Sequence, residues 1–471
     1  MREVEVAIIG AGSAGLYCMG QVKRFTDNFV LIDGGELGTT CARVGCMPSK
    51  VMIQVAEDFQ RRTIFNRQGI EGKEHLSINI EDAMEHVQDM RDTFVDQTLS
   101  HSIDMMPQQQ LIESNAHFVD ANTLETDDGE IIKAKRIIIA TGSRPIIPDS
   151  WAEFADNIYT TDEIFEQEEL AESIAVIGLG VIGLEIGQSL SRLGSTVTGI
   201  DQQNIIGGID DPAVNKVAID IIGKEFPLWL GHAAEIKSLD NGKLQVSAGD
   251  RCVEVDKIFA SLGRRPNTDK LNLQSTGLKI SANGVPEFNP HTMQLGDSSI
   301  YIAGDCTAEN PILHEAGFEG RVAGYNIMQD KPVEFKQKTP LAIIFCEPNI
   351  VSVGARLSEL DDDNIAIGEI KMAPVGRALI MGKNKGLIHL YAEKKTGKLL
   401  GASMVCVKGE NLGHLVCWCI EMGMTVQQML RMPFYHPVIE EALQAALYNL
   451  RGKLEIEGTD WPMEIQAINS L

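Results

Sequence analysis

Blocks of apolar residues separated by glycine-rich loops predict the same structural unit twice along the chain. An apolar run at residues 4–9 leads into a glycine-rich loop, a helical stretch and a second apolar run that ends in Asp33. The same order begins again at Ser173 and ends in Asp201. Short apolar runs bounded by glycines are typical of buried strands, and the stretch between them is long enough for a helix. We therefore expect two strand–loop–helix–strand units of an α/β fold.

Both loops have the pattern G-x-G-x-x-G. The first glycine of such a loop permits a tight turn, the second lets the backbone approach a pyrophosphate, and the third lets the helix pack on the strand. The helix N-terminus supplies N–H donors for phosphates, and the terminal acid accepts from a ribose hydroxyl. One such loop alone is more often a plain turn, but two complete units of equal spacing favour two dinucleotide sites. The glycines are Gly10, Gly12 and Gly15 in the first loop and Gly178, Gly180 and Gly183 in the second.

The residues after Asp201 indicate which dinucleotide binds the second unit. Asp201 is followed by Gln202, Gln203 and Asn204, and no Lys or Arg occurs before Lys216. The 2′-phosphate of NADP needs a nearby cation. The sequence therefore favours NAD over NADP at this site.

The size and charge of the chain restrict its partners and its location. The 471 residues allow about three domains. The 66 acidic residues outnumber the 41 basic ones, and the net charge of −25 repels nucleic acid and anionic lipid surfaces. No export signal precedes the first strand, no apolar stretch reaches the ~20 residues that cross a bilayer, and nine cysteines in so long a chain do not form a disulfide scaffold. We expect a cytoplasmic protein without nucleic-acid or membrane partners.

Cys41 and Cys46 lie five residues apart, shortly after the acid of the first unit. Such a pair can form a disulfide across a turn. A zinc site needs further ligands at metal spacing. The other close pair, Cys417 and Cys419, lies in an apolar helical run, where we expect buried structural thiols. No metal site is predicted, and on spacing alone a redox pair and a coincidence stay equally open.

The two dinucleotide sites favour the redox interpretation of the cysteines. A disulfide takes up two electrons as two thiols, a nicotinamide carries two electrons as a hydride, and a flavin exchanges electrons with both. Two nucleotide sites and a cysteine pair are the parts of such an electron path. This interpretation assigns FAD to the first unit, beside the cysteines, and NAD to the second.

Seven segments along the whole chain resemble the class I flavoprotein pyridine nucleotide-disulfide oxidoreductases, and most closely the dihydrolipoamide dehydrogenases. The segment that contains both cysteines, residues 38–50, is similar to the active-disulfide segment of this family. The other similar segments are the two glycine-rich loops, residues 140–142, 263–267 and 302–305, and His436-Pro437.

The resemblance implies an α/β fold with two Rossmann-like domains, for FAD and NAD, and a C-terminal α+β dimerisation domain. Residues 1–150 would form the first part of the FAD-binding domain, and residues 151–270 the NAD-binding domain. Residues 271–335 would return to complete the FAD-binding region. Residues 336–471 would form the interface domain.

The resemblance also implies roles for individual residues. Cys41 is similar to the thiol that exchanges with substrate, and Cys46 to the thiol that faces the flavin. Lys50 resembles the lysine beside the flavin N5, with Glu185 as its ion-pair partner, whereas by themselves these two residues read as a surface charge pair. Cofactor contacts are implied for both glycine-rich loops, Asp33, Thr40, Lys50, Thr141, Gly142, Asp201, Gly263, Asp305 and Ala316.

His436 is similar to the acid–base residue of the family, and Glu441 to the carboxylate that orients it. Imidazole suits proton transfer to a thiolate near neutral pH. Pro437 is favourable at the first position of a helix, so we expect a helix to begin there. By themselves, Glu440 and Glu441 are favourable first-turn charges. In the family this histidine reaches the cysteines of the other subunit, which implies a homodimer.

The function implied is NAD-linked oxidation of dihydrolipoamide through a Cys41–Cys46 disulfide, with a role in cell redox homeostasis. The lipoyl group would come from another chain, with a 2-oxoacid dehydrogenase complex as the implied partner. Arg43, Phe434 and Val438 depart from the residues usual in lipoamide enzymes. No cysteine follows Cys419, so we expect no C-terminal cysteine pair of the mercuric reductase type. Two alternatives stay open: an NAD(P)H-dependent reductase of glutathione-like or unknown small disulfides, and a flavoprotein interaction subunit without turnover.

Overall fold

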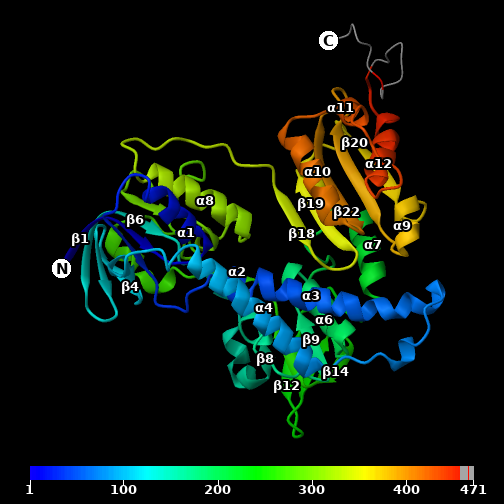
Figure 1. The fold of residues 1–471 in the computed structure, drawn as a ribbon, viewed down its shortest axis with the longest axis horizontal. Helices are drawn as coiled ribbons and strands as arrows, with labels where there is room; N and C mark the ends of the chain where they lie inside the picture. Colours follow the sequence, from blue (N-terminus) through cyan, green and yellow to red (C-terminus); the bar gives the residue numbers. More distant parts are fainter. Residues whose placement is uncertain (457–464, 466–471) are drawn as a thin grey trace.

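The computed structural model describes residues 1–456 and residue 465. The rest of the C-terminal segment, for which we expect no cysteine pair, lies outside the described residues. Figure 1 shows three lobes, with α2 and α3 at their junction. Among the described residues, no helix is long and apolar enough to cross a membrane.

The first lobe contains the N-terminal strand–loop–helix–strand unit. Its central strands pair in parallel, with Val6 of β1 opposite Phe29 of β2, and β17 returns from residue 300 to pair with β6. Ile8 and Ile138 are fully buried in this sheet. The strands are β1 (Arg2–Ile9), β2 (Phe29–Ile32), β3 (Leu111–Ile112), β4 (Ala116–Asp120), β5 (Thr123–Thr126), β6 (Ile131–Ile139) and β17 (Ile300–Ile302), and the helices are α1 (Ser13–Val22), α2 (Thr40–Val44) and α8 (Leu313–Asn326). The helices α3 (Cys46–Gln60) and α4 (Ile80–Ser100) continue from the junction and pack on the second lobe (Figure 1).

The second lobe repeats this unit in an all-parallel sheet of order β11-β10-β9-β15-β8. The sheet strands are β8 (Ile158–Tyr159), β9 (Ser173–Ile177), β10 (Thr196–Asp201), β11 (Leu228–Leu230) and β15 (Lys257–Ala260), with helices α5 (Thr161–Ile164), α6 (Val181–Leu193) and α7 (Pro212–Ile222). A three-stranded sheet of β12 (Glu235–Ser238), β13 (Leu244–Ala248) and β14 (Arg251–Val255) adjoins it, and β7 (Ser143–Pro145) pairs with β16 (Arg264–Pro266) between the two lobes.

The third lobe is an antiparallel five-stranded sheet with helices packed on it. Its strands are β18 (Leu341–Ile344), β19 (Asn349–Gly354), β20 (Ile365–Lys371), β21 (Leu387–Glu393) and β22 (Leu399–Cys406). Its helices are α9 (Gly376–Met381), α10 (Gly409–Glu421), α11 (Val426–Leu430) and α12 (Glu441–Arg451). Figure 1 shows α7 of the second lobe against this sheet.

A buried acid–histidine pair joins α7 to the third lobe. Asp211 caps α7, because its Oδ1 accepts hydrogen bonds from the amides of Ala213 and Val214. Its Oδ2 lies 2.6 Å from Nδ1 of His389 and accepts a hydrogen bond of 2.7 Å from the hydroxyl of Tyr391. The pair holds two domains together through a charge that solvent does not reach.

The surroundings of Asp211 and His389 favour the charged form of both side chains. Burial lowers the pKa of His389, but hydrogen bonds to Asp211 and Glu369 outweigh burial and raise this pKa above its ordinary value. Burial raises the pKa of Asp211, whereas the hydrogen bonds from His389 and Tyr391 bring it down to about 2. Folding therefore favours a protonated histidine beside an ionised aspartate.

We expect His389→Asn to destabilise the protein most at about pH 5.5, by roughly 1–3 kcal/mol, and least at about pH 9. The contribution of His389 is complete below its unfolded pKa of about 6.5 and is lost as the pH rises through its raised folded pKa. The contribution of Asp211 is lost only in acid, below about pH 4. Thermal unfolding at several pH values measures this, with exposed His75→Asn as the control. An equal Tm difference at both pH values would contradict the prediction.

Candidate active site

Cys41 and Cys46 lie on two successive helices that meet at Gly45. Cys41 belongs to the short α2, which Thr39 caps by accepting a hydrogen bond from the amide of Ala42 (3.3 Å). Cys46 is the first residue of α3. A Cβ at Gly45 would lie 2.9 Å from the carbonyl oxygen of Thr40, so a side chain there would push the two helices apart. The absence of that side chain brings the two cysteines together.

Cys41 and Cys46 are free thiols whose side chains shift each other's pKa in opposite directions. The hydrogen bond from Cys41, together with the cation of Lys50, lowers the pKa of Cys46 to about 7 against the effect of burial. The same hydrogen bond and burial raise the pKa of Cys41. Cys46 also lies at the positive end of a 15-residue helix, which favours a thiolate. The surroundings therefore favour the thiolate at Cys46 over the thiolate at Cys41.

Lys50 and Glu185 form the ion pair that the resemblance implied, with Nζ 2.8 Å from Oε2. Glu185 is buried within α6, so the alternative of a surface charge pair is wrong. Its other oxygen, Oε1, accepts a hydrogen bond of 2.8 Å from the amide of Phe345, and the Lys50 ammonium lies 4.8 Å from the centre of the Phe345 ring. The lysine is held one helical turn beyond Cys46 on the same face of α3.

His436 and Glu441 are paired at a different place in the chain. Nδ1 of His436 lies 2.9 Å from Oε1 of Glu441, whose Oε2 accepts a hydrogen bond from the amide of Val438. The hydrogen bond from His436 lowers the pKa of Glu441. The expected helix start at Pro437 is wrong: α12 begins at Glu441, because residues 437–440 turn so that Glu441 reaches back to the imidazole. The helices that flank His436, α11 and α12, belong to the third lobe, whereas Cys41 belongs to α2 at the junction of the lobes (Figure 1).

The first glycine-rich loop has the geometry of a pyrophosphate site. Gly10 has φ of +109°, and a Cβ at Gly15 would lie 1.9 Å from the carbonyl oxygen of Gly10, so neither position tolerates a side chain. A Cβ at Gly12 would meet nothing within 4 Å, which leaves the loop open on the side where a ligand approaches. Asp33 closes the loop by accepting hydrogen bonds from the amides of Ala11 (2.6 Å) and Gly35 (2.8 Å).

The second loop repeats these contacts almost atom for atom. Gly178 has φ of +95°, a Cβ at Gly183 would lie 1.9 Å from the carbonyl oxygen of Gly178, and Gly180 is open. Asp201 accepts from the amides of Leu179 (2.7 Å) and Gln203 (2.8 Å). The repeat in the sequence is therefore a repeat of geometry, and both loops fit a dinucleotide.

A second group of predicted residues lies beyond the first loop. Oγ1 of Thr141 is buried and, among the described residues, has no hydrogen-bond partner, so it is free to bind a ligand. Asp305 accepts a hydrogen bond of 2.7 Å from Ser143, which Arg264 holds in turn. These residues fit FAD, which Gly12, Asp33, Thr141 and Asp305 would hold. The other predicted residues are Thr40 at the start of α2, Gly142 and Gly263 in left-handed turns with φ of +67° and +104°, and Ala316 buried in α8.

Three contributors to this region are absent from the sequence-based prediction. Arg264 braces Ser143 and lies within the matched segment 263–267, so the segment itself was a signal for it. Glu319 on α8 accepts a hydrogen bond of 2.7 Å from the amide of Gly304, directly before Asp305. Phe345 holds Glu185. An acid inside a helix and an aromatic residue after a strand carry no signal for these contacts in the sequence.

The other close cysteine pair differs from its prediction. Cys417 and Cys419 are partly exposed rather than buried, because they lie on the flanks of α10, on either side of Trp418, which is 61% exposed. Within the part of the chain that the structure describes, no group of three or more His, Cys, Asp or Glu side chains could hold a metal ion.

Comparisons with known proteins define the class of the protein. Residues 4–322 match the family model described as pyridine nucleotide-disulphide oxidoreductase, and residues 341–447 match the dimerisation domain of the same family. The chain belongs to the pyridine nucleotide-disulphide oxidoreductase family. It is a flavoprotein disulfide oxidoreductase with FAD and NAD(P) as its cofactors, and the predicted fold class is confirmed.

Individual relatives differ in their activities. The chain is 29% identical to a mercuric reductase of Acidithiobacillus ferrooxidans over 460 residues, which cover 94% of this chain and 82% of the relative. It is 27% identical to a dihydrolipoyl dehydrogenase of Staphylococcus aureus over 457 residues, 94% of this chain and 96% of the relative. The solved structure of the Cu(II) complex of the HOCl-induced flavoprotein disulfide reductase RclA from Escherichia coli has a TM-score of 0.83 at 20% identity, and the match covers 95% of this chain and 99% of that one.

We expect Glu319→Gln to raise Tm at about pH 9 and to leave it almost unchanged at about pH 5. Burial raises the pKa of Glu319 to about 8. An acid with a raised folded pKa lowers stability progressively as the pH rises from its unfolded value of about 4.3 to its folded value. Glutamine keeps an acceptor for the Gly304 amide but cannot ionise. Thermal unfolding at both pH values measures the effect, with Asp330→Asn as an exposed control; an equal shift at both would refute it.

Proposed function

We propose that the chain oxidises a dithiol to a disulfide with NAD as the electron acceptor, and that dihydrolipoamide is its substrate. The observation that carries the proposal is Cys46, a thiol with a lowered pKa at the start of α3, beside Cys41 and the Lys50–Glu185 pair. The near-complete mutual coverage with a dihydrolipoyl dehydrogenase supports the substrate. His314 on α8 resembles a histidine typical of lipoamide enzymes and supports it further, although Leu313 stands where those enzymes usually have alanine.

In the oxidised enzyme Cys41 and Cys46 would form a disulfide. A substrate thiolate attacks Cys41, the bond between the two cysteines breaks, and Cys46 leaves as a thiolate that Lys50 and the helix N-terminus stabilise. The second substrate thiol then attacks the mixed disulfide, which releases Cys41 and the cyclic substrate disulfide. Bound FAD supplies the two-electron carrier between the cysteines and the nicotinamide.

His436 would accept the proton that the substrate thiol loses. Glu441 orients Nδ1, which leaves Nε2 for the thiol. His436 lies in a different lobe from the cysteines, and its side chain is 80% exposed. The match of residues 341–447 to a dimerisation domain supports a homodimer, in which this imidazole would serve the cysteines of the partner subunit.

A second candidate is an NAD(P)H-dependent reductase of another small disulfide. Phe434, where lipoamide enzymes usually have a histidine, packs against the core of the third lobe, and Arg43 pairs with Glu36. A panel of lipoamide, glutathione disulfide and other small disulfides, with NADH and with NADPH, separates the two candidates. Turnover at least about ten-fold faster with lipoamide and NADH supports the first.

Cys46→Ser should lower turnover with dihydrolipoamide by at least about 10³-fold, because serine can neither form the disulfide nor leave as a thiolate. The long-wavelength absorbance of a thiolate next to flavin should disappear in the same variant. Steady-state kinetics and the visible spectrum of the reduced protein test this, with exposed Cys252→Ser as the control. Retention of both signals in Cys46→Ser would exclude the proposed chemistry.

His436→Gln should lower turnover by about 10²- to 10⁴-fold, the range of a lost general acid–base residue. Glutamine can still hydrogen-bond to Glu441 but cannot carry the proton. The pH profile of turnover measures this, and His414→Gln on α10 is the control. Unchanged turnover in His436→Gln would remove the histidine from the mechanism.

A further inference from the structure

The turn between β18 and β19 binds α6 at two places. The amide of Phe345 donates to Oε1 of Glu185 (2.8 Å), and the amide of Glu347 donates to Oε1 of Gln188 (2.8 Å). Gln188 returns a hydrogen bond of 2.9 Å to the carbonyl oxygen of Glu347. The third lobe therefore holds the carboxylate that pairs with Lys50.

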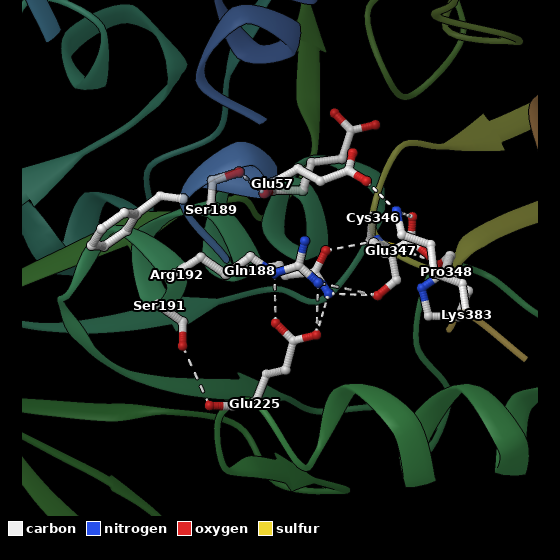
Figure 2. A network of polar contacts seen from close by, with 12 residues as sticks. Glu57, Gln188, Ser189, Ser191, Arg192, Glu225, Cys346, Glu347, Pro348 and Lys383 are labelled. Atoms are coloured by element: carbon white, nitrogen blue, oxygen red, sulfur yellow. Dashed lines mark hydrogen bonds and ion pairs between the residues drawn. The ribbon is translucent and has the colours of Figure 1, made fainter. Parts of the chain in front are cut away.

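Lys383 extends this contact to α3. Its Nζ lies 2.8 Å from Oε2 of Glu347 and also forms an ion pair with Glu57, as Figure 2 shows. The three side chains are 31%, 22% and 34% exposed, so water screens them only in part. A single cation thus joins the β18–β19 turn to the helix that begins with Cys46.

Lys50 and Glu57 lie on the same face of α3, because seven residues are about two helical turns. Both line a cavity of about 260 Å³, whose opposite wall includes Phe345 and Glu347. This face of α3 is therefore held at two points, by Glu185 at Lys50 and by Lys383 at Glu57. The Lys383–Glu57 pair is not itself part of the electron path.

We propose that Lys383 is a positioning residue for the Lys50–Glu185 pair beside Cys46, and that it acts through Glu57 and Glu347. The inference rests on the proposed function, because the pair matters only if Cys46 turns over. Without Lys383, the carboxylates of Glu57 and Glu347 would repel each other across the cavity. The turn would then move from α3, and Lys50 would lose the Phe345 ring and its fixed place near Cys46.

The test compares Lys383→Met with Lys408→Met, which removes one cation from the same cavity but bridges no two domains. The dithiol-reduced flavoprotein is treated with iodoacetamide across a pH series, and peptide mass spectrometry gives the alkylation rate of Cys46. We expect the pH midpoint of this rate to rise by about 0.5 to 1 unit in Lys383→Met and to stay unchanged in Lys408→Met. Reduction of the flavin by NADH should slow about ten-fold at equal FAD content. Lys383→Arg should restore both the pH midpoint of Cys46 alkylation and the rate of flavin reduction.

Equal alkylation profiles in Lys383→Met, Lys408→Met and the natural protein would overturn the inference. If Lys383→Met does not fold, Glu347→Ala removes the contact of Lys383 with the turn while the Lys383–Glu57 pair remains, and the same upward shift is expected. An unshifted midpoint in that variant would equally overturn it. The proposed function and the role of Lys383 are tested by different measurements. Failure of NADH to reduce the flavin of the natural protein would contradict the proposed function, whereas the alkylation profiles of the variants test the role of Lys383.

Discussion

The carboxylate of Glu185 is the constraint on which the arrangement of the three lobes depends. A buried carboxylate is stable only if both of its oxygens are bound. One oxygen binds Lys50 of α3 and the other binds the amide of Phe345 in the third lobe, while the residue itself belongs to the second. Satisfying this one charge therefore fixes the cysteine helix, the second dinucleotide loop and the β18–β19 turn relative to one another.

In the two glycine-rich loops, too, a carboxylate holds a segment in place, here by accepting hydrogen bonds from backbone amides. In each, an acid at the end of the neighbouring strand accepts from an amide of the loop, at 2.6 Å for Asp33 and 2.7 Å for Asp201. The acid thus keeps the loop closed before any ligand binds, and its remaining lone pairs stay available for a ribose. Because both loops lie at the carboxyl ends of parallel strands, the fold presents two preformed sites of one kind.

The two glycine-rich loops could be predicted from the residues themselves, because their signal is local and has a fixed spacing. The Lys50–Glu185 pair, 135 residues apart in the chain, and the choice of Glu441 as the partner of His436 followed only from the resemblance to the family. The start of α12 was misplaced, because the favourable first position for Pro437 gave way to the turn that lets Glu441 reach His436. The contacts of Phe345 and Lys383 join segments 160 and 326 residues apart in the chain, and Glu319 binds an amide 15 residues before it. No local pattern specifies any of these contacts.

The cysteines and His436 lie in different parts of the molecule, and this separation indicates a role for the third lobe. Cys41 and Cys46 belong to the helices at the junction of the lobes, whereas His436, which pairs with Glu441, belongs to the third lobe (Figure 1). The neighbouring Tyr435 is 81% exposed, and Trp418 and Met422 on α10 are 61% and 78% exposed. Large exposed apolar side chains mark a surface that another protein covers. On the proposed function, a second copy of the chain would cover this surface and at the same time bring His436 to the cysteines of its partner, so that burial of apolar area and completion of the site become a single event.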